Sequence, residues 1–272
     1  MKLSLCNEVI RELAFERQCA LAAGLGYRGL EVAPFTFGDD AWRMPASKRA
    51  DIRKACADSG IAVSGLHWLL AAPAGLSITS ADRAVWERSV EVLRASVELC
   101  ADLGGDYLVH GSPAQRRVTA ADDGKRAEEA WRIAAAEAGQ AGVTYCLEAL
   151  ARPDCNFVNT LAEAADVVRR NGNPALTLMV DTLAASLEEK EPVADVIRRW
   201  MPTGLMAHIQ FNDRNKRGPG EGTDKFAPIV QALRETGYAG WIAMEPFVYE
   251  PDGPTCAARM IGYVSGLLEQ QK

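Results

Sequence analysis

Short apolar runs alternate with longer amphipathic segments along the whole chain. The apolar runs have the length of β-strands, and the longer segments repeat their apolar positions at the helical period. The eight predicted strands are residues 3–6, 29–33, 61–66, 107–109, 143–147, 176–180, 205–211 and 241–244. The predicted helices are residues 11–25, 46–58, a segment from a cap near Ser80 to Gly104, 123–140, 160–170, 187–200, 227–235 and 256–268.

Two of these helices have particularly clear signals. In the third, one apolar stripe recurs at steps of four and three: Trp86, Val90, Leu93, Val97 and Cys100. In the fifth, Thr160 precedes Glu163 by three residues, which is the pattern of a capping box.

Eight strand and helix units in series, with no composition break between them, predict a parallel sheet. Because eight is the number of strands that closes such a sheet, we expect one (β/α)8 TIM barrel domain over residues 1–272. An open doubly wound sheet is the main alternative. Neither G-x-G-x-x-G nor G-x-x-x-x-G-K-[ST] follows the first predicted strand, so the nucleotide-binding motifs typical of that fold are absent.

Composition and charge narrow the range of partners. The net charge is −6 and no dense block of Lys or Arg occurs, so we expect no nucleic-acid partner. No apolar run approaches about 18 residues, so we expect no membrane span. The start MKLSLCNEVIREL lacks the apolar region of a signal peptide, and seven cysteines without a C-x-x-C pair are typical of buried thiols. The expected location is cytoplasmic, and a homo-oligomer is an open alternative to a monomer.

Four polar side chains end or follow four successive predicted strands in the second half of the chain. They are Glu148, Asp181, Gln210 and Glu245. Their intervals of 33, 29 and 35 residues each correspond to about one strand and helix unit. Since active sites of (β/α)8 barrels form at the C-terminal ends of the strands, we expect these groups at the same height on four adjacent strands.

Carboxylates that converge in one cavity raise one another's pKa unless a cation shares the space. The carboxylates of Glu148, Asp181 and Glu245, together with the amide oxygen of Gln210, make an all-oxygen ligand set. Such a set suits Mn²⁺ or Mg²⁺, with Co²⁺ as a further candidate, whereas zinc usually takes nitrogen or sulfur ligands. The alternative interpretation is that Glu148 and Glu245 form ion pairs with arginines at the barrel rim.

The candidate substrate-binding residues also lie near strand ends or in the loops that follow. All three histidines do so, although for any single histidine a hydrogen-bonded core position is the more common explanation. The basic loop residues could bind a carboxylate or phosphate, and solvated loop charges explain them equally well; Arg152 belongs to this group. The candidates are His67, Trp68, His110, Asp154, His208, Lys216 and Arg217. His208 could also orient a metal ligand, because it lies two residues before Gln210.

Four motifs resemble the xylose-isomerase-like sugar isomerase and epimerase family, which includes ketose 3-epimerases, hydroxypyruvate isomerase and 2-oxo-tetronate isomerases. They are CLEAL around Glu148, MVDT around Asp181, HIQFND followed by GPGEG, and GYAGWIAMEPF around Glu245. The first half of the chain adds the strand pattern and GLEVAPF.

The resemblance implies a metal held by Glu148, Asp181, Gln210 and Glu245, with the two glutamates as the acid and base. The implied reaction is proton transfer next to a carbonyl of a sugar, keto-sugar or sugar acid through a metal-bound cis-enediolate. The chain departs from the ketose epimerases at three positions. Gln210 stands where they usually have histidine, Ala184 stands where a second histidine is expected, and Lys216 is nearest to the expected arginine.

Two other functions remain open. A lyase of the same superfamily, acting on an inosose or a dehydroshikimate-like compound, would share the first proton abstraction and then expel a hydroxyl group. A non-catalytic metabolite-binding barrel would hold the metal without turnover. A DNA-repair endonuclease of related fold needs a cluster of zinc-binding histidines, and three histidines are too few.

Overall fold

Eight parallel strands close into a barrel in the computed structural model of the chain, which describes residues 1–269. Each strand pairs with the next along the chain, and β8 returns to pair with β1. The strands are β1 (Lys2–Cys6), β2 (Gly29–Val32), β3 (Ala62–Leu66), β4 (Tyr107–His110), β5 (Thr144–Glu148), β6 (Leu176–Asp181), β7 (Met206–Phe211) and β8 (Trp241–Met244). This arrangement confirms the predicted (β/α)8 TIM barrel.

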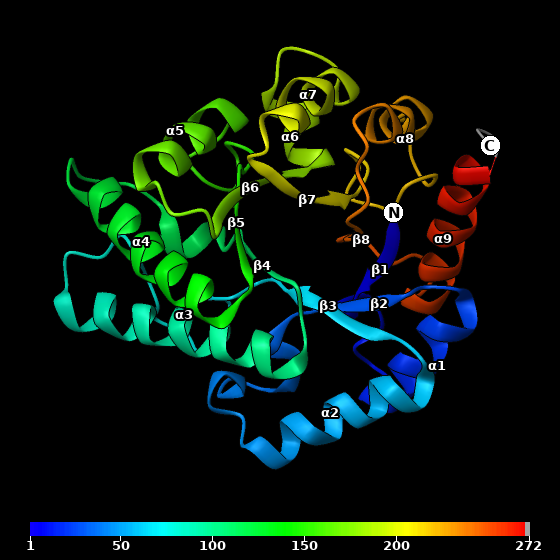
Figure 1. Ribbon diagram of the computed structural model, residues 1–272, viewed down its shortest axis with the longest axis horizontal. Helices are drawn as coiled ribbons and strands as arrows, with labels where there is room; N and C mark the ends of the chain where they lie inside the picture. Colours follow the sequence, from blue (N-terminus) through cyan, green and yellow to red (C-terminus); the bar gives the residue numbers. More distant parts are fainter. Residues whose placement is uncertain (270–272) are drawn as a thin grey trace.

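Helices surround the barrel on all sides, as the view along its axis shows (Figure 1). The α-helices are α1 (Phe15–Leu25), α2 (Ala46–Ser59), α3 (Arg83–Leu103), α4 (Asp123–Ala141), α5 (Leu161–Asn171), α6 (Thr182–Glu188), α7 (Val193–Trp200), α8 (Phe226–Glu235) and α9 (Gly253–Glu269). Short 3-10 helices are η1 (Asn7–Ile10), η2 (Pro34–Phe37), η3 (Ala41–Arg43), η4 (Pro113–Arg116) and η5 (Met201–Thr203).

Among the predicted boundaries that differ from the structure, three have a clear local reason. The first helix begins at Phe15 rather than residue 11, because residues 7–10 form η1 and the Asn7 side chain accepts a hydrogen bond from the Ala33 N–H at 2.8 Å. The segment 187–200 is split between α6 and α7, with Pro192 as the extended N-cap of α7. The N-cap of α3 is Asp82, whose carboxylate accepts from the Ala84 N–H at 2.9 Å.

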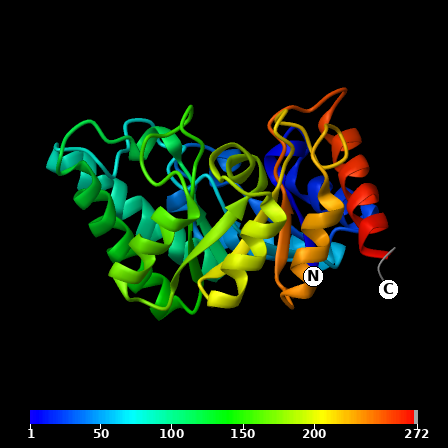
Figure 2. The ribbon, with the colours of Figure 1, turned by 90° about the horizontal axis from the view of Figure 1, so that it is seen from above.

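The loops that follow the strands gather at one end of the barrel, along the upper edge of Figure 2, and the N-terminus lies towards the opposite end. The loop after β7 and the loop after β8 lie side by side there, joined by hydrogen bonds from the Phe247 and Val248 N–H groups to the Lys216 carbonyl. This end of the barrel is therefore built from the segments that carry the predicted site.

Two further expectations from the sequence agree with the structure. Within residues 1–269, no helix has the length and apolar character that crossing a membrane requires. All seven cysteines are buried and free, as predicted for structural thiols.

Candidate active site

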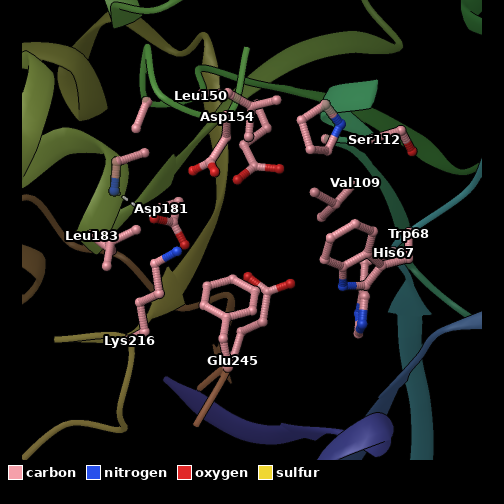
Figure 3. Close-up of a pocket in the computed structure, with 16 residues that line it drawn as sticks. His67, Trp68, Val109, Ser112, Leu150, Asp154, Asp181, Leu183, Lys216 and Glu245 are labelled. Carbon is pink, nitrogen blue, oxygen red and sulfur yellow. Dashed lines mark hydrogen bonds between the residues drawn. The ribbon is translucent and has the colours of Figure 1, made fainter. Parts of the chain in front are cut away.

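A cavity of about 220 Å³ opens at the C-terminal ends of the strands. It is smaller than the pockets of drug-sized ligands, so it suits a small molecule. The lining residues are His67, Trp68, Val109, Gly111, Ser112, Pro113, Glu148, Leu150, Ala151, Asp154, Asp181, Leu183, Ala184, Lys216, Glu245 and Phe247. Asp181 and Lys216 lie on one side, Trp68 lies on the other, and the Glu245 side chain points into the space between them (Figure 3).

Three of the predicted ligands, Glu148, Asp181 and Glu245, line this one cavity. Their exposed fractions are only 8%, 4% and 5%. Asp181 is fixed by two donors: the Ala184 N–H at 2.7 Å to Oδ1 and the Asn212 side-chain amide at 2.7 Å to Oδ2. Within the described chain, neither Glu148 nor Glu245 forms an ion pair with a lysine or arginine, so the rim-arginine alternative finds no support.

The pKa values of the three carboxyl groups are raised, as expected for acidic groups that are buried near one another. Burial, followed by the charge of Asp181, raises the pKa of Glu148 to about 8. Burial also raises the pKa of Asp181 to about 6. The pKa of Glu245 lies well above its ordinary value because of burial, with Glu148 and Asp181 adding to the effect against the opposing charge of His67. The protein alone therefore does not satisfy these charges, whereas a divalent cation would.

Gln210 lies on β7 directly opposite Asp181 in the strand register, and it is fully buried. Its side-chain Nε2 donates to Glu31 Oε1 at 2.6 Å. Its Oε1 is buried and has no hydrogen-bond partner among the described residues. Leaving a buried amide oxygen without a partner costs about 1–3 kcal/mol. A bound cation would supply the missing partner, so this atom fits the role of a metal ligand.

The strand register shows how the predicted ligands are offset from one another along the sheet. Gln210 pairs with Asp181, but Glu148 pairs with Met179, two residues before Asp181. Strands in a closed barrel are tilted and staggered, so register partners do not lie at equal heights along the barrel axis, and the common height of the four ligands stays a prediction.

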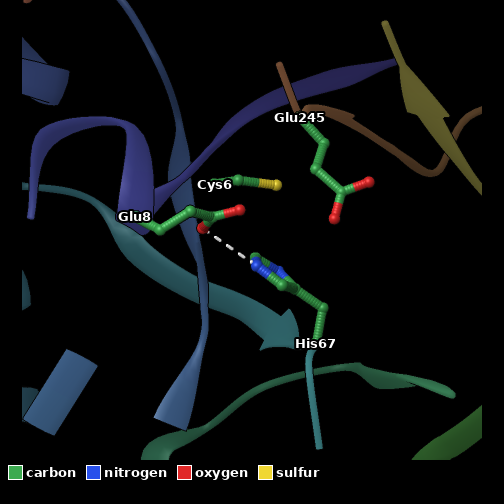
Figure 4. A group of neighbouring side chains, drawn as sticks. All are labelled: Cys6, Glu8, His67 and Glu245. Carbon is green, nitrogen blue, oxygen red and sulfur yellow. Dashed lines mark hydrogen bonds and ion pairs between the residues drawn. The ribbon is translucent and has the colours of Figure 1, made fainter. Parts of the chain in front are cut away.

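A second group of potential metal ligands overlaps the first at Glu245. Ligand atoms of Cys6, Glu8, His67 and Glu245 all lie within 4.8 Å of one another, and Figure 4 shows the four side chains grouped together. The two ring nitrogens of His67 face carboxylates: Nε2 lies 2.9 Å from Glu8 and Nδ1 lies 2.8 Å from Glu31.

The carboxylates that face His67 also shift its pKa. Burial alone lowers the pKa of His67, but Glu8 and Glu31 together raise it well above its ordinary value. The all-oxygen set of Glu148, Asp181, Gln210 and Glu245 shares Glu245 with this group and stays a prediction.

The structure places four of the seven predicted substrate-binding residues in the cavity lining: His67, Trp68, Asp154 and Lys216. Lys216 brings a positive charge to a lining with four carboxyl groups. Its backbone carbonyl accepts the hydrogen bonds that join the loops after β7 and β8, which fixes the segment that carries this side chain.

The other three, His110, His208 and Arg217, lie outside this lining. His110 is buried with Nδ1 2.6 Å from the Tyr145 hydroxyl. The buried His208 ring stacks on Tyr107 at 3.9 Å between centroids, and Arg217 forms an ion pair with Glu250. Arg152, likewise outside the lining, pairs with Glu188.

Several lining residues have a backbone conformation that is uncommon without glycine. Trp68, Ser112 and Lys216 have φ values of 53°, 48° and 67°. Such conformations cost on the order of 1–3 kcal/mol each and tend to cluster at functional sites. Their location supports the assignment of this cavity as the site.

Sequence reasoning missed two buried acidic residues beside the site, Glu8 and Glu31. Glu31 lies between two buried apolar residues, Leu30 and Val32, and is itself fully buried. A charged residue inside a short apolar strand was the signal that could have identified it, because an unpaired buried charge is strongly disfavoured.

Comparisons with known proteins agree with the barrel fold. The sequence model of the xylose isomerase-like TIM barrel family matches residues 19–262. L-ribulose 3-epimerase of Mesorhizobium japonicum is 32% identical over 203 residues, which span 73% of this chain and 66% of that protein. D-psicose 3-epimerase of Agrobacterium fabrum is 29% identical over 237 residues, which span 83% and 77%. A solved structure of L-ribulose 3-epimerase has a TM-score of 0.84 at 26% identity, covering 99% of this chain and 95% of that one.

Proposed function

This chain belongs to the xylose isomerase-like TIM barrel family, and on that basis we propose that it is a divalent-metal-dependent epimerase or isomerase of a sugar, keto-sugar or sugar acid. The main observation behind this proposal is that one small cavity is lined by Glu148, Asp181 and Glu245, which come from three different strand ends. The buried, unpartnered amide oxygen of Gln210 on β7 completes the proposed set.

The proposed ligands of the cation, Mn²⁺ or Mg²⁺, are Glu148, Asp181, Gln210 and Glu245. Their all-oxygen chemistry and the raised pKa values of the three carboxyl groups support this assignment. When bound, the cation would polarise a sugar carbonyl and make the neighbouring C–H bond more acidic.

Glu148 and Glu245 are the proposed acid and base. They come from β5 and β8, which are separated in the barrel by β6 and β7, so they approach the cavity from different sides. One carboxylate takes the proton from the carbon next to the carbonyl, and the other donates a proton to the opposite face of that carbon. This inverts the carbon and gives an epimer, whereas return of the proton to the adjacent carbon gives an isomer.

Epimerisation is the preferred proposal, because both curated relatives are named 3-epimerases. The proposed substrate contacts are His67, Trp68, Asp154 and Lys216. The Trp68 ring offers an apolar wall, while Lys216 can donate hydrogen bonds to a hydroxyl or carboxylate oxygen.

Solvent exchange tests this proposal directly. The protein is incubated with Mn²⁺ and a panel of ketopentoses, ketohexoses and keto acids in deuterated water, and the products are examined by NMR and mass spectrometry. One deuterium at the carbon next to the carbonyl, with inverted configuration, is the expected result. Loss of water would identify a lyase, and binding without exchange would identify a non-catalytic barrel.

Two substitutions test the proposed roles of Glu245 and Gln210. Glu245→Gln is expected to lower exchange by about 10²–10⁴-fold, the usual contribution of a general acid or base. Gln210→Ala is expected to weaken Mn²⁺ binding at least about tenfold, because even the partners of metal ligands contribute about 10–100-fold.

Cys6→Ser is the matched control for the second group of potential ligands. It should leave Mn²⁺ affinity unchanged if the metal is held by the all-oxygen set. Near-normal exchange in Glu245→Gln would contradict the proton-transfer role, and weaker Mn²⁺ binding in Cys6→Ser would favour the group around His67.

A further inference from the structure

A buried carboxylate that has no part in the proposed chemistry connects four strands beneath the cavity. Glu31, on β2, is fully buried. Its Oε1 lies 2.8 Å from His67 Nδ1 and accepts from Gln210 Nε2 at 2.6 Å. Its Oε2 accepts from the Tyr107 hydroxyl and lies 2.8 Å from His208 Nε2. Residues of β4 and β7 and the end of β3 thus converge on one group.

The contact with Gln210 decides which end of that amide is left without a partner. A carboxylate that is ionised only accepts hydrogen bonds, so the NH₂ end of the amide must face Glu31. Each oxygen of Glu31 lies 2.8 Å from a histidine ring nitrogen, and Oε2 also accepts from the Tyr107 hydroxyl, which are the surroundings of an acceptor. Gln210 Oε1 is left buried and without a partner.

We propose that Glu31 is a positioning residue that holds the Gln210 amide with its oxygen directed to the divalent cation. This inference rests on the proposed function, in which Gln210 is a metal ligand. A glutamine amide has two chemically different ends of nearly equal shape, and only the oxygen end can bind a cation. One buried acceptor at Nε2 removes that ambiguity and leaves Oε1 preorganised.

The test is the Mn²⁺ affinity of the purified protein, measured by calorimetry and by the electron paramagnetic resonance signal of free Mn²⁺. Glu31→Gln has the same shape but offers both a donor and an acceptor, so the Gln210 amide can take either orientation. It is expected to weaken Mn²⁺ binding about 10–100-fold. In the Gln210→Ala background, Glu31→Gln should cause no further loss beyond about threefold, because Glu31 acts through Gln210.

Tyr107→Phe is the matched control. It removes another hydrogen bond to the same carboxylate but leaves the Gln210 contact in place. Mn²⁺ affinity close to that of the unaltered protein is expected. A loss in Tyr107→Phe equal to that in Glu31→Gln would show a general effect of disturbing Glu31 and would overturn the proposal.

The exchanged pair Glu31→Gln with Gln210→Glu keeps one donor and one carboxylate in the same contact, with their places reversed. It should recover Mn²⁺ affinity to within about threefold of the unaltered protein. If Glu31→Gln alone does not fold, this variant still tests the contact, because it keeps the number of charges and hydrogen bonds, and a loss of more than about tenfold in it would overturn the proposal.

The two proposals fail in different ways. Unchanged Mn²⁺ affinity in Gln210→Ala would overturn the ligand set and this inference together. Weakened binding in Gln210→Ala with unchanged binding in Glu31→Gln would overturn the role of Glu31 alone. If Glu31→Gln lowers Mn²⁺ affinity equally in the unaltered protein and in the Gln210→Ala variant, Glu31 does not act through Gln210, and its proposed role is likewise overturned.

Discussion

Glu148 can reach the cavity because position 111 carries no side chain. A Cβ atom at Gly111 would overlap Glu148 Oε2 and stand 3.3 Å from its Cδ. Both residues line the cavity, so the missing side chain gives the carboxylate the space it occupies. The sequence showed Glu148 as a candidate but gave no indication that Gly111, on a different strand end, makes room for it.

Gly111→Ala should therefore displace the Glu148 carboxylate without disturbing the fold. We expect exchange to fall on the order of 10²-fold, since a misplacement of about 1 Å can have that effect. The measurement is the rate of deuterium incorporation, with circular dichroism to check the fold.

Gly139→Ala is the control for that substitution. Gly139 lies in α4, and a Cβ there would meet only the Ala175 Cβ at 3.5 Å and the Asn173 side chain at 3.7 Å. Exchange should be unchanged and stability should rise by up to about 1 kcal/mol, because alanine is the better helix former. An undiminished rate in Gly111→Ala would contradict the proposed placement of Glu148.

Helix ends show how far local sequence signals extend. The capping box predicted at Thr160 is confirmed: Thr160 Oγ1 accepts from the Glu163 N–H at 3.2 Å, and Glu163 Oε2 accepts from the Thr160 N–H at 3.3 Å. The same reasoning failed at the N-cap near Ser80 and at the start of the first helix. At α3 the cap is Asp82, two residues after Ser80. Before α1, the contact of Asn7 with the Ala33 N–H, which lies outside the helix, decided the boundary.

Thr160→Ala should destabilise α5 and, through it, the whole domain. The expected loss is about 1 kcal/mol of the free energy of unfolding, the usual effect of removing an N-cap side chain. For a chain of this size that corresponds to a Tm lower by about 2–4 °C.

Thr223→Ala is the comparison for this effect, because Thr223 is exposed and lies outside the helices and strands. Its stability should stay within about 0.5 kcal/mol of the unaltered protein. Urea unfolding followed by circular dichroism measures both variants. An equal loss in the two variants would show that α5 gains nothing specific from its cap.

The two ends of the barrel have different roles, one in function and the other in stability. The candidate site occupies the end where the strands finish, while the opposite end has its own polar contacts. There, Asp106 accepts from the Trp241 indole N–H at 2.6 Å and from Lys2 Nζ at 3.4 Å. Lys2 and Trp241 are paired residues of β1 and β8, the two strands that close the barrel.

Asp106→Ala should weaken this closure without affecting the site. Loss of the two contacts is expected to lower the free energy of unfolding by about 1 kcal/mol. Mn²⁺ affinity and the rate of exchange should not change, because the cavity lies at the other end. Thermal unfolding with a parallel Mn²⁺ titration tests this, and a marked fall in affinity would contradict the separation.

The amino-acid sequence by itself determined the number and order of strand and helix units and the polar residues that end the strands. These properties depend on local periodicity and residue type, which the chain carries at every position. Tertiary structure alone decided the stagger that sets Glu148 two residues away from Asp181 in register, the space at Gly111 and the contact between Glu31 and Gln210. That last pair is 179 residues apart. Such contacts depend on how the tilted strands close into a barrel, and no local pattern encodes that closure.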